Sequence, residues 1–359
     1  MVKTQNKRIT YIDIARGVAL IMVILTHASI GWWINDGKYQ WITNFLMIGN
    51  LPVFFFLSGF LFRDYTWKKR ISNTFNNLVI PYIFGSLVIF LLALFLHTGS
   101  RSALAGALYG NGGHDLTLFG NLMPIGAIWF FLALAVSTMF FSGLVKIISR
   151  LQIGELVQRC LILIISLIVF FLVVRTDFTS HYLLPFDLQS GALGISFLSV
   201  GYLFKYGYDY APAQYAYLTK PYTFILFLLF WIFLSKNNVF YFVSAVVEGN
   251  VIQTLVAAIA SIIVILNFSV WIDCNYGKCV AWIGRNSGMF MVTHDWVLIV
   301  LQVRFINQYL YFFHLNNYLG WSIAFAVIAS LTFLIGSVLY PTKYINRIFF
   351  QRNWPIKVQ

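Results

Sequence analysis

Residues 9–27 read ITYIDIARGVALIMVILTH, and this stretch decides the class of fold. Asp13, Arg16 and His27 interrupt a run that is otherwise long and apolar enough to form a membrane-spanning helix. Arg16 and His27 are eleven residues apart. In a helix they therefore share one face to within about 20° and lie about 16 Å apart along the axis. Because ionisable side chains inside a span usually mark a functional site, the stretch predicts a membrane helix that carries chemistry.

The composition extends this conclusion to the whole chain. Of its 359 residues, 60% are hydrophobic and 10% are charged, and the mean hydropathy is +0.80, which excludes a soluble globular domain. Runs of spanning length lie at about 9–33, 44–62, 78–97, 127–147, 160–176, 188–205, 221–235, 251–270, 282–303 and 319–340. Continuous apolar runs favour helices over a β-barrel. We predict an all-α, polytopic membrane bundle of about ten transmembrane helices.

The chain is expected to form a single integral membrane domain, 1–359, with spans over about 9–340 and a basic tail at 341–359. The run at 221–235 is short and ends at the polar break Lys236-Asn237-Asn238. The stretch that follows, 239–250, is predicted as an interfacial helix. The longest loop, about 98–126, could fold over a pocket, or it could be a solvated connector.

The distribution of basic residues predicts the orientation. Segments on the side of the two termini hold 18 Lys and Arg residues, and the opposite loops hold five. By the positive-inside rule, both termini are cytoplasmic. The net charge of +13 therefore reports topology and attraction to anionic lipid, and it does not indicate nucleic acid binding.

Several short patterns follow one another in order along the chain. They are YIDIARG at 11–17 with His27, PVFFFLSGFLF at 52–62, KKR at 68–70, NLVIPY at 77–82, IWFFL at 128–132, and IGRNS at 283–287 leading to His294. This ordered set resembles the acyltransferase 3 family of membrane-bound O-acyltransferases, in particular the branch like bacterial fucose 4-O-acetylases. The resemblance covers about residues 9–340.

The resemblance implies ten helices in a bacterial plasma membrane, a cytosolic acyl-CoA donor and a cell-surface sugar as the extracytoplasmic acceptor. Arg16 and His27 match the Arg and His of the family's first helix. The chain departs from the family at Thr74 and Asn77, where relatives often carry an Arg-x2-Arg pattern, and the basic run at 68–70 could take its place. It also departs at Asn50, where many relatives of this branch have a His.

The residue types fit acyl transfer to a hydroxyl, which requires a base, an adjacent thioester carbonyl and donors for the developing oxyanion. His27 is the best candidate base, because a neutral imidazole can accept a hydroxyl proton. His294 is the second catalytic candidate: it could orient His27, bind the acceptor or simply join two helices. Supporting roles are assigned to Asp13, Ser58, Asn286, Ser287 and Asp295.

Donor binding is assigned to basic residues near the cytoplasmic face. Arg16 could hold a phosphate of coenzyme A, or it could form an i, i+3 ion pair with Asp13 that makes membrane insertion less costly. Lys69 and Arg70 are the other candidate donor-binding residues.

The predicted function is transfer of an acyl group, acetyl in the first place, from acyl-CoA to a hydroxyl of an extracytoplasmic cell-surface or exopolysaccharide sugar. The alternative is a polysaccharide or small-molecule transporter, because charged residues in spans also mark transport paths. The expected partners are acyl-CoA, the glycan and the lipid bilayer. We expect no metal site and no permanently bound cofactor, since the chain has no metal-ligand cluster and no phosphate-binding loop.

Overall fold

The structure is a computed structural model. It describes residues 9–33, 40–97, 100–113, 116–176, 181–273, 277–301 and 317–349. Some of the basic residues counted for the orientation lie outside the described residues. They are those in segment 1–8, Lys38, Arg304 and those beyond residue 349.

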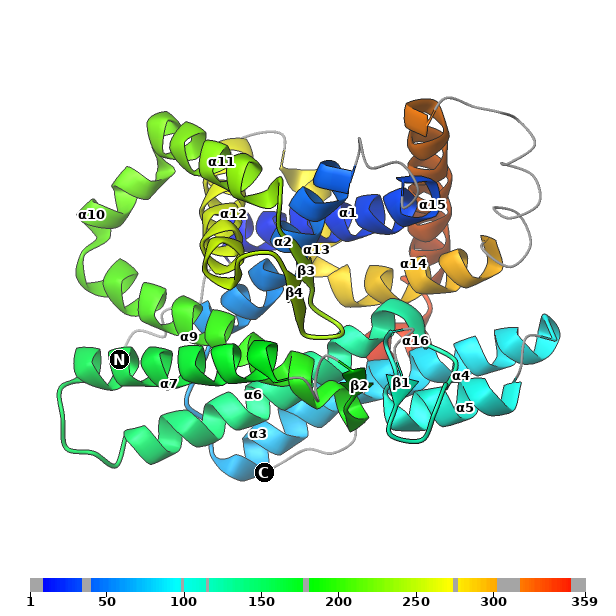
Figure 1. Ribbon diagram of the computed structural model, residues 1–359, viewed down its shortest axis with the longest axis horizontal. Helices are drawn as coiled ribbons and strands as arrows, with labels where there is room; N and C mark the ends of the chain where they lie inside the picture. The colour runs from blue at the N-terminus through cyan, green and yellow to red at the C-terminus, as the bar shows by residue number, and fades with distance from the viewer. Residues whose placement is uncertain are drawn as a thin grey trace.

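Helices occupy all ten predicted spans, which confirms the all-α membrane fold (Figure 1). Their bounds are α1 Thr10–Trp33, α2 Gln40–Phe60, α4 Ile80–Phe95, α6 Trp129–Ile148, α7 Glu155–Arg175, α9 Leu188–Tyr210, α11 Pro221–Ser235, α12 Val251–Ile272, α14 Ser287–Leu301 and α15 Asn317–Leu339. The shorter helices are α3 Trp67–Thr74, α5 Ser100–Tyr109, α10 Pro212–Tyr215, α13 Lys278–Arg285 and α16 Lys343–Phe349.

Within the described ranges, seven helical segments are long and apolar enough to cross a membrane unaided. The other three predicted spans differ from these for separate reasons. Helices α11 and α14 have only 15 residues each. Helix α9 has 23 residues but carries Gln189, Ser190, Ser196 and Ser199, all of them buried. It packs against α2, α6 and α7, so it needs few lipid-facing apolar side chains.

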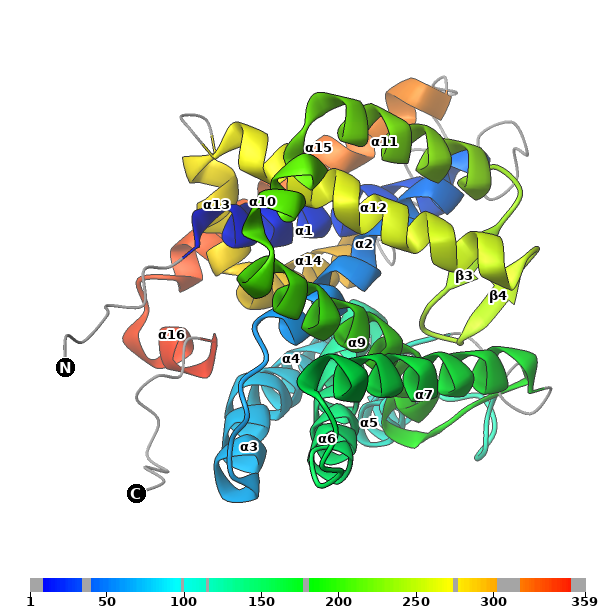
Figure 2. The ribbon, with the colours of Figure 1, turned by 90° about the vertical axis from the view of Figure 1, so that its left-hand side faces the viewer.

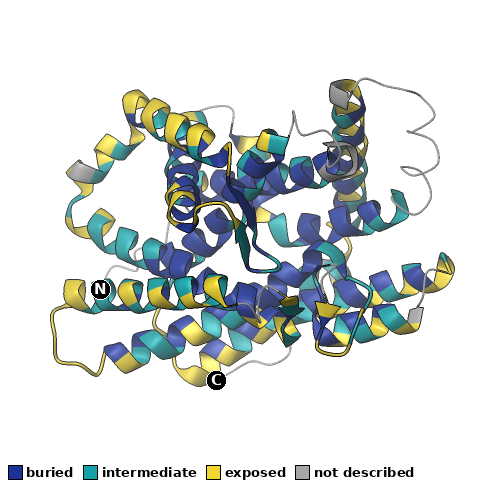
Figure 3. Cartoon of the chain, viewed as in Figure 1, coloured by how far each residue is buried: buried dark blue, intermediate teal, exposed yellow. Residues whose placement is uncertain are grey.

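The core lies where α1, α2 and α9 meet the helices around them (Figures 2 and 3). Aromatic side chains fill it: Phe55 of α2 stacks on Phe242 at a centroid distance of 5.0 Å and meets Phe130 of α6 edge-on at 5.4 Å. Exposed apolar residues lie instead on peripheral helices such as α7, where Leu172 is 62% exposed. This distribution suits a bundle whose outer surface faces lipid.

The prediction of an interfacial helix at 239–250 is wrong, because this segment is a β-hairpin. Strand β3 (Val239–Tyr241) pairs antiparallel with β4 (Val246–Glu248). The β-branched and aromatic residues here favour strand, and the turn contains Ala245 at φ 57°. A second small sheet joins the segments between α5 and α6 and between α7 and α9, where β1 (Leu116–Thr117) pairs in parallel with β2 (Tyr182–Leu183).

Two predicted boundaries also change. The third span is continuous with the basic segment before it, because α3, a π-helical turn at Phe75–Val79 and α4 follow one another without a break. The ninth span, predicted as one run from 282 to 303, is interrupted at Asn286, which separates α13 from α14. Its side-chain Nδ2 donates to the Trp282 carbonyl at 2.8 Å, which caps the end of α13.

In Figure 1 the α6–α7 connection and α10, two segments predicted to be cytoplasmic, lie at the left, and the strands β1 to β4 lie further to the right. Which end faces the cytoplasm stays a prediction.

Candidate active site

A close crossing of α1 and α13 brings two arginines together. A Cβ added to Gly284 would lie 1.7 Å from the Asp13 carbonyl oxygen, and one added to Gly17 would lie 2.3 Å from that of Val280. Only glycine permits backbones to approach so closely. The crossing places Arg16 of α1 and Arg285 of α13 on the wall of one cavity.

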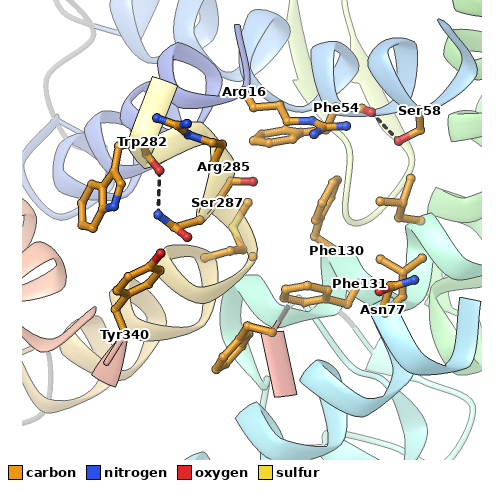
Figure 4. Close-up of a pocket in the computed structure, with 16 residues that line it drawn as sticks. Arg16, Phe54, Ser58, Asn77, Phe130, Phe131, Trp282, Arg285, Ser287 and Tyr340 are labelled. Atoms are coloured by element: carbon orange, nitrogen blue, oxygen red, sulfur yellow. Dashed lines mark hydrogen bonds between the residues drawn. The ribbon is translucent and has the colours of Figure 1, made fainter. Parts of the chain in front are cut away.

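This cavity, called the arginine cavity below, has a volume of about 760 Å³. Figure 4 shows Arg16 and Arg285 on one side of the cavity, across from Phe131 and Asn77, with their guanidinium groups pointing in different directions. Its other walls combine aromatic with hydroxyl and amide side chains, including Phe54, Phe130, Trp282, Tyr340, Ser58, Asn286 and Ser287. Three of the predicted supporting residues, Ser58, Asn286 and Ser287, therefore meet at one place. Two guanidinium groups beside an apolar wall suit a ligand with both phosphates and an organic body.

Arg16 contacts its predicted ion-pair partner and also faces the cavity. Its Nη1 lies 3.8 Å from Asp13 Oδ1, and the two side chains are 29% and 5% exposed. The separation is near the limit for an ion pair, and Asp13 is the more deeply buried group. Both roles weighed for Arg16 are therefore compatible with its position.

The two catalytic candidates form a pair. The ring centroids of His27 on α1 and His294 on α14 lie 5.4 Å apart, with a 47° angle between the ring planes. Met291 lines the arginine cavity, and it precedes His294 by one helical turn, or about 5 Å along the axis. The histidine pair thus lies just beyond the cavity wall.

The two histidines differ in accessibility and in partners. His294 is fully buried, whereas His27 is partly exposed. His294 Nδ1 lies 3.3 Å from the Phe290 carbonyl oxygen, and its Nε2 has no hydrogen-bond partner among the described residues. A proton on Nδ1 donated to that carbonyl would leave the Nε2 lone pair available. An unpaired buried polar atom costs about 1–3 kcal/mol, so its persistence suits a site that binds something.

Asp295 connects the histidine pair to a specific turn. Its Oδ1 accepts a hydrogen bond from the Ala127 backbone N–H at 2.9 Å, and its Oδ2 has no partner within the part of the chain that is described. Gly126, in the 3₁₀ turn η2 (Gly126–Ile128), has φ +68°. A Cβ at this position would lie 2.0 Å from Asp295 Oδ1. Glycine is therefore needed here for both its backbone angle and its size.

A buried polar network flanks His27 on its own helix. Asn50 Nδ2 donates to Thr26 Oγ1 at 3.0 Å, and Thr26 donates in turn to the Met22 carbonyl at 2.8 Å. Thr43 Oγ1 donates to Ser29 Oγ at 3.2 Å. Asn50 thus ties α2 to the α1 residue next to His27.

Lys69 and Arg70 do not line the arginine cavity. The Lys69 ammonium lies 4.4 Å from the centre of the Tyr65 ring. Arg70 is buried, donates to the Arg63 carbonyl and lies 4.4 Å from the Phe62 ring centre. These contacts give both residues a local structural role, and their part in donor binding stays a prediction.

Sequence reasoning missed Arg285 as a site residue. Its signal was present in the IGRNS pattern at 283–287, but proximity to Arg16 depends on the α1–α13 crossing. Two histidines lie in segments that the topology places outside: His181 is exposed, and His114 lies outside the described residues. In the described ranges no group of three or more His, Cys, Asp or Glu residues could hold a metal ion.

A family model described as an acyltransferase domain matches residues 9–340. The chain belongs to this acyltransferase family. The match covers the arginine cavity up to Tyr340 and both histidines, and it confirms the acyltransferase 3 resemblance; the fucose 4-O-acetylase-like branch stays a prediction. No curated protein and no solved structure matches the chain. The protein is a membrane acyltransferase.

Proposed function

We propose that this acyltransferase moves an acetyl group from cytosolic acetyl-CoA to a hydroxyl of an extracytoplasmic cell-surface sugar. The observation that carries the proposal is the His27–His294 pair, 5.4 Å between ring centroids, one helical turn beyond a cavity that contains two arginines. A base next to a phosphate-binding cavity is what transfer from a coenzyme A thioester requires.

The arginine cavity supports the donor assignment. Arg16 and Arg285 offer planar donors to the phosphates of coenzyme A, and the aromatic wall offers apolar surface to the rest of the molecule. The cavity is lined by residues near the ends of α2 and α13, near the starts of α1 and α14, and at the start of α6. All of these except the start of α6 lie toward the side predicted to be cytoplasmic, where acyl-CoA is available.

The chemical step uses His27 as general base. His27 accepts the proton of the acceptor hydroxyl while the hydroxyl oxygen bonds to the thioester carbonyl carbon. The carbon–sulfur bond then breaks, coenzyme A leaves as a thiolate, and the proton on His27 passes to that sulfur. His27 is preferred over His294 because it is partly exposed, whereas His294 is fully buried. His294 then acts as a positioning residue behind it.

The transporter alternative predicts a different effect of deleting the protein on the surface glycan of the cells. Deleting a transporter changes the amount of surface glycan, whereas deleting an O-acetyltransferase removes ester groups and leaves the glycan in place. NMR of surface glycans from cells with and without the protein distinguishes the two. Loss of O-acetyl signals with unchanged glycan yield supports the proposal, and unchanged ester signals would overturn it.

A further inference from the structure

Asp187 lies buried at the start of α9. It is 1% exposed, and neither carboxylate oxygen has a hydrogen-bond partner within the described residues. It occupies the N-cap position of α9, where a carboxylate ordinarily accepts from the first free amides. Here the side chain makes no such bond. Capping therefore does not account for this aspartate.

The backbone holds Asp187 in an unusual conformation. Phe186 and Asp187 both have positive φ, at 57° and 51°, a region that residues with a Cβ rarely adopt. Strain of this kind persists where the surroundings impose it, and it is frequent at binding sites. Burial also raises the pKa of the Asp187 carboxyl well above its usual range.

Other unpaired oxygens are connected to Asp187 through direct contacts. The backbone of Phe186 lies against Gly110, whose added Cβ would be 3.0 Å from the Phe186 Cα. The next residue, Asn111, is 1% exposed, and its Oδ1 has no partner in the described structure. The Asn111 backbone carbonyl accepts from the Ile125 N–H at 2.8 Å.

The contacts that begin at Asn111 and Ile125 lead on to the histidine pair. Two residues after Ile125, the Ala127 N–H donates to Asp295, whose second oxygen is also unpaired among the described atoms. Asp295 follows His294 directly in sequence. On α4, Tyr82 lies near enough to Asp187 to interact with it electrostatically. A series of contacts thus links the unpaired oxygens of Asp187, Asn111 and Asp295, and Asp295 is next to His294 in sequence.

The unpaired atoms on Asp187, Asn111 and Asp295 are all oxygens, and the protonated form of the Asp187 carboxyl also has one O–H to donate. The ligand that satisfies them must supply several groups that donate and accept hydrogen bonds and must carry no negative charge, which describes a polyhydroxylated sugar. The segments involved follow α5 and β2, in loops predicted to be extracytoplasmic. Resting on the proposed function, we propose that Asp187, with Asn111 and Asp295, binds hydroxyl groups of the acyl acceptor.

The test measures transfer of labelled acetyl from acetyl-CoA by purified protein in lipid nanodiscs. The acceptor is the surface glycan extracted from cells that lack the protein. Asp187→Asn keeps the size of the side chain but removes a carboxylate oxygen, and Asp187→Ala removes the group. We expect either variant to raise the acceptor KM about tenfold or more. The affinity for coenzyme A should stay within about twofold, and the melting temperature should not fall.

The matched control is Asp209→Asn at the other end of the same helix, where Asp209 is exposed and pairs with Lys205. It should leave the acceptor KM unchanged. An unchanged KM in a folded Asp187→Asn protein would overturn the inference and indicate that these oxygens bind only water. A parallel loss of coenzyme A affinity would overturn it in favour of a structural role. Absence of transfer by the wild type would instead contradict the proposed function.

Discussion

At the residue scale, the two histidines make separable predictions. If His27 is the base, His27→Ala and His27→Gln should both reduce acetyl transfer by about 10²–10⁴-fold, because an amide cannot accept the proton at neutral pH. His294→Gln should reduce transfer less, since an amide can keep a positioning hydrogen bond. Initial rates at matched protein levels measure both effects. Near wild-type transfer by a folded His27→Gln protein would remove His27 as the base and make His294 the leading candidate.

The two cavity arginines make a second prediction at this scale. Arg16→Ala and Arg285→Ala should each weaken coenzyme A binding by about tenfold or more, because each removes charge-assisted bonds to phosphate. Arg101→Ala is the matched control, since Arg101 is exposed on α5. Isothermal titration with coenzyme A measures the affinities. Equal affinity in wild type and Arg16→Ala would leave Arg16 only as the ion-pair partner of Asp13.

At the element scale, the turn before α6 should be sensitive to a single methyl group. Gly126→Ala adds a Cβ that would lie 2.0 Å from Asp295 Oδ1, whereas Gly120→Ala at φ +88° meets nothing within 4 Å. Both changes place alanine at a positive φ and cost about 1–2 kcal/mol. Only Gly126→Ala displaces Asp295, so it alone should reduce transfer beyond its effect on melting temperature. Equal transfer by the two folded variants would contradict the role of this turn.

The crossing of α1 and α13 makes a similar prediction for stability. Gly284→Ala would place a Cβ 1.7 Å from the Asp13 carbonyl oxygen, but Gly143→Ala in α6 would meet only a Trp67 ring atom at 3.7 Å. The first change should lower the melting temperature, since backbone must move. The second should be neutral or stabilising, by about 0.5–1 kcal/mol. Thermal unfolding in detergent measures both, and equal melting temperatures would contradict the close approach.

The same elements show how far sequence reasoning reaches. Hydropathy places a helix at every predicted span, because burial in lipid requires long apolar runs whatever the tertiary contacts. The prediction of one run from 282 to 303 misses the break at Asn286, although Arg285, Asn286 and Ser287 interrupt the apolar residues there. The cap itself depends on one amide side chain. Likewise, the face shared by Arg16 and His27 follows from helical periodicity. The proximity of Arg285 and Asp187 to the site depends on packing between helices distant in sequence.

At the scale of the whole molecule, the donor and acceptor assignments depend on orientation. Arg16 and Arg285 lie in segments near the side predicted to be cytoplasmic, and Asp187 follows β2, in a segment predicted to be outside. A reversed protein would present the arginine cavity to a compartment without acyl-CoA. The mechanism therefore requires both termini to be cytoplasmic, as the 18 to five distribution of basic residues predicts.

Cysteine labelling measures that orientation, and the structure selects the positions. Asn111 is in a predicted outer loop but is 1% exposed, so a cysteine there would not react from either side. Phe119 is 78% exposed, and Gln152, in the α6–α7 connection, is also exposed. With the three native cysteines replaced by serine, an impermeant maleimide should label Phe119→Cys in intact cells and Gln152→Cys only after permeabilisation. The reverse pattern would place the arginine cavity outside, and Arg16 and Arg285 would then lose their assignment to acyl-CoA.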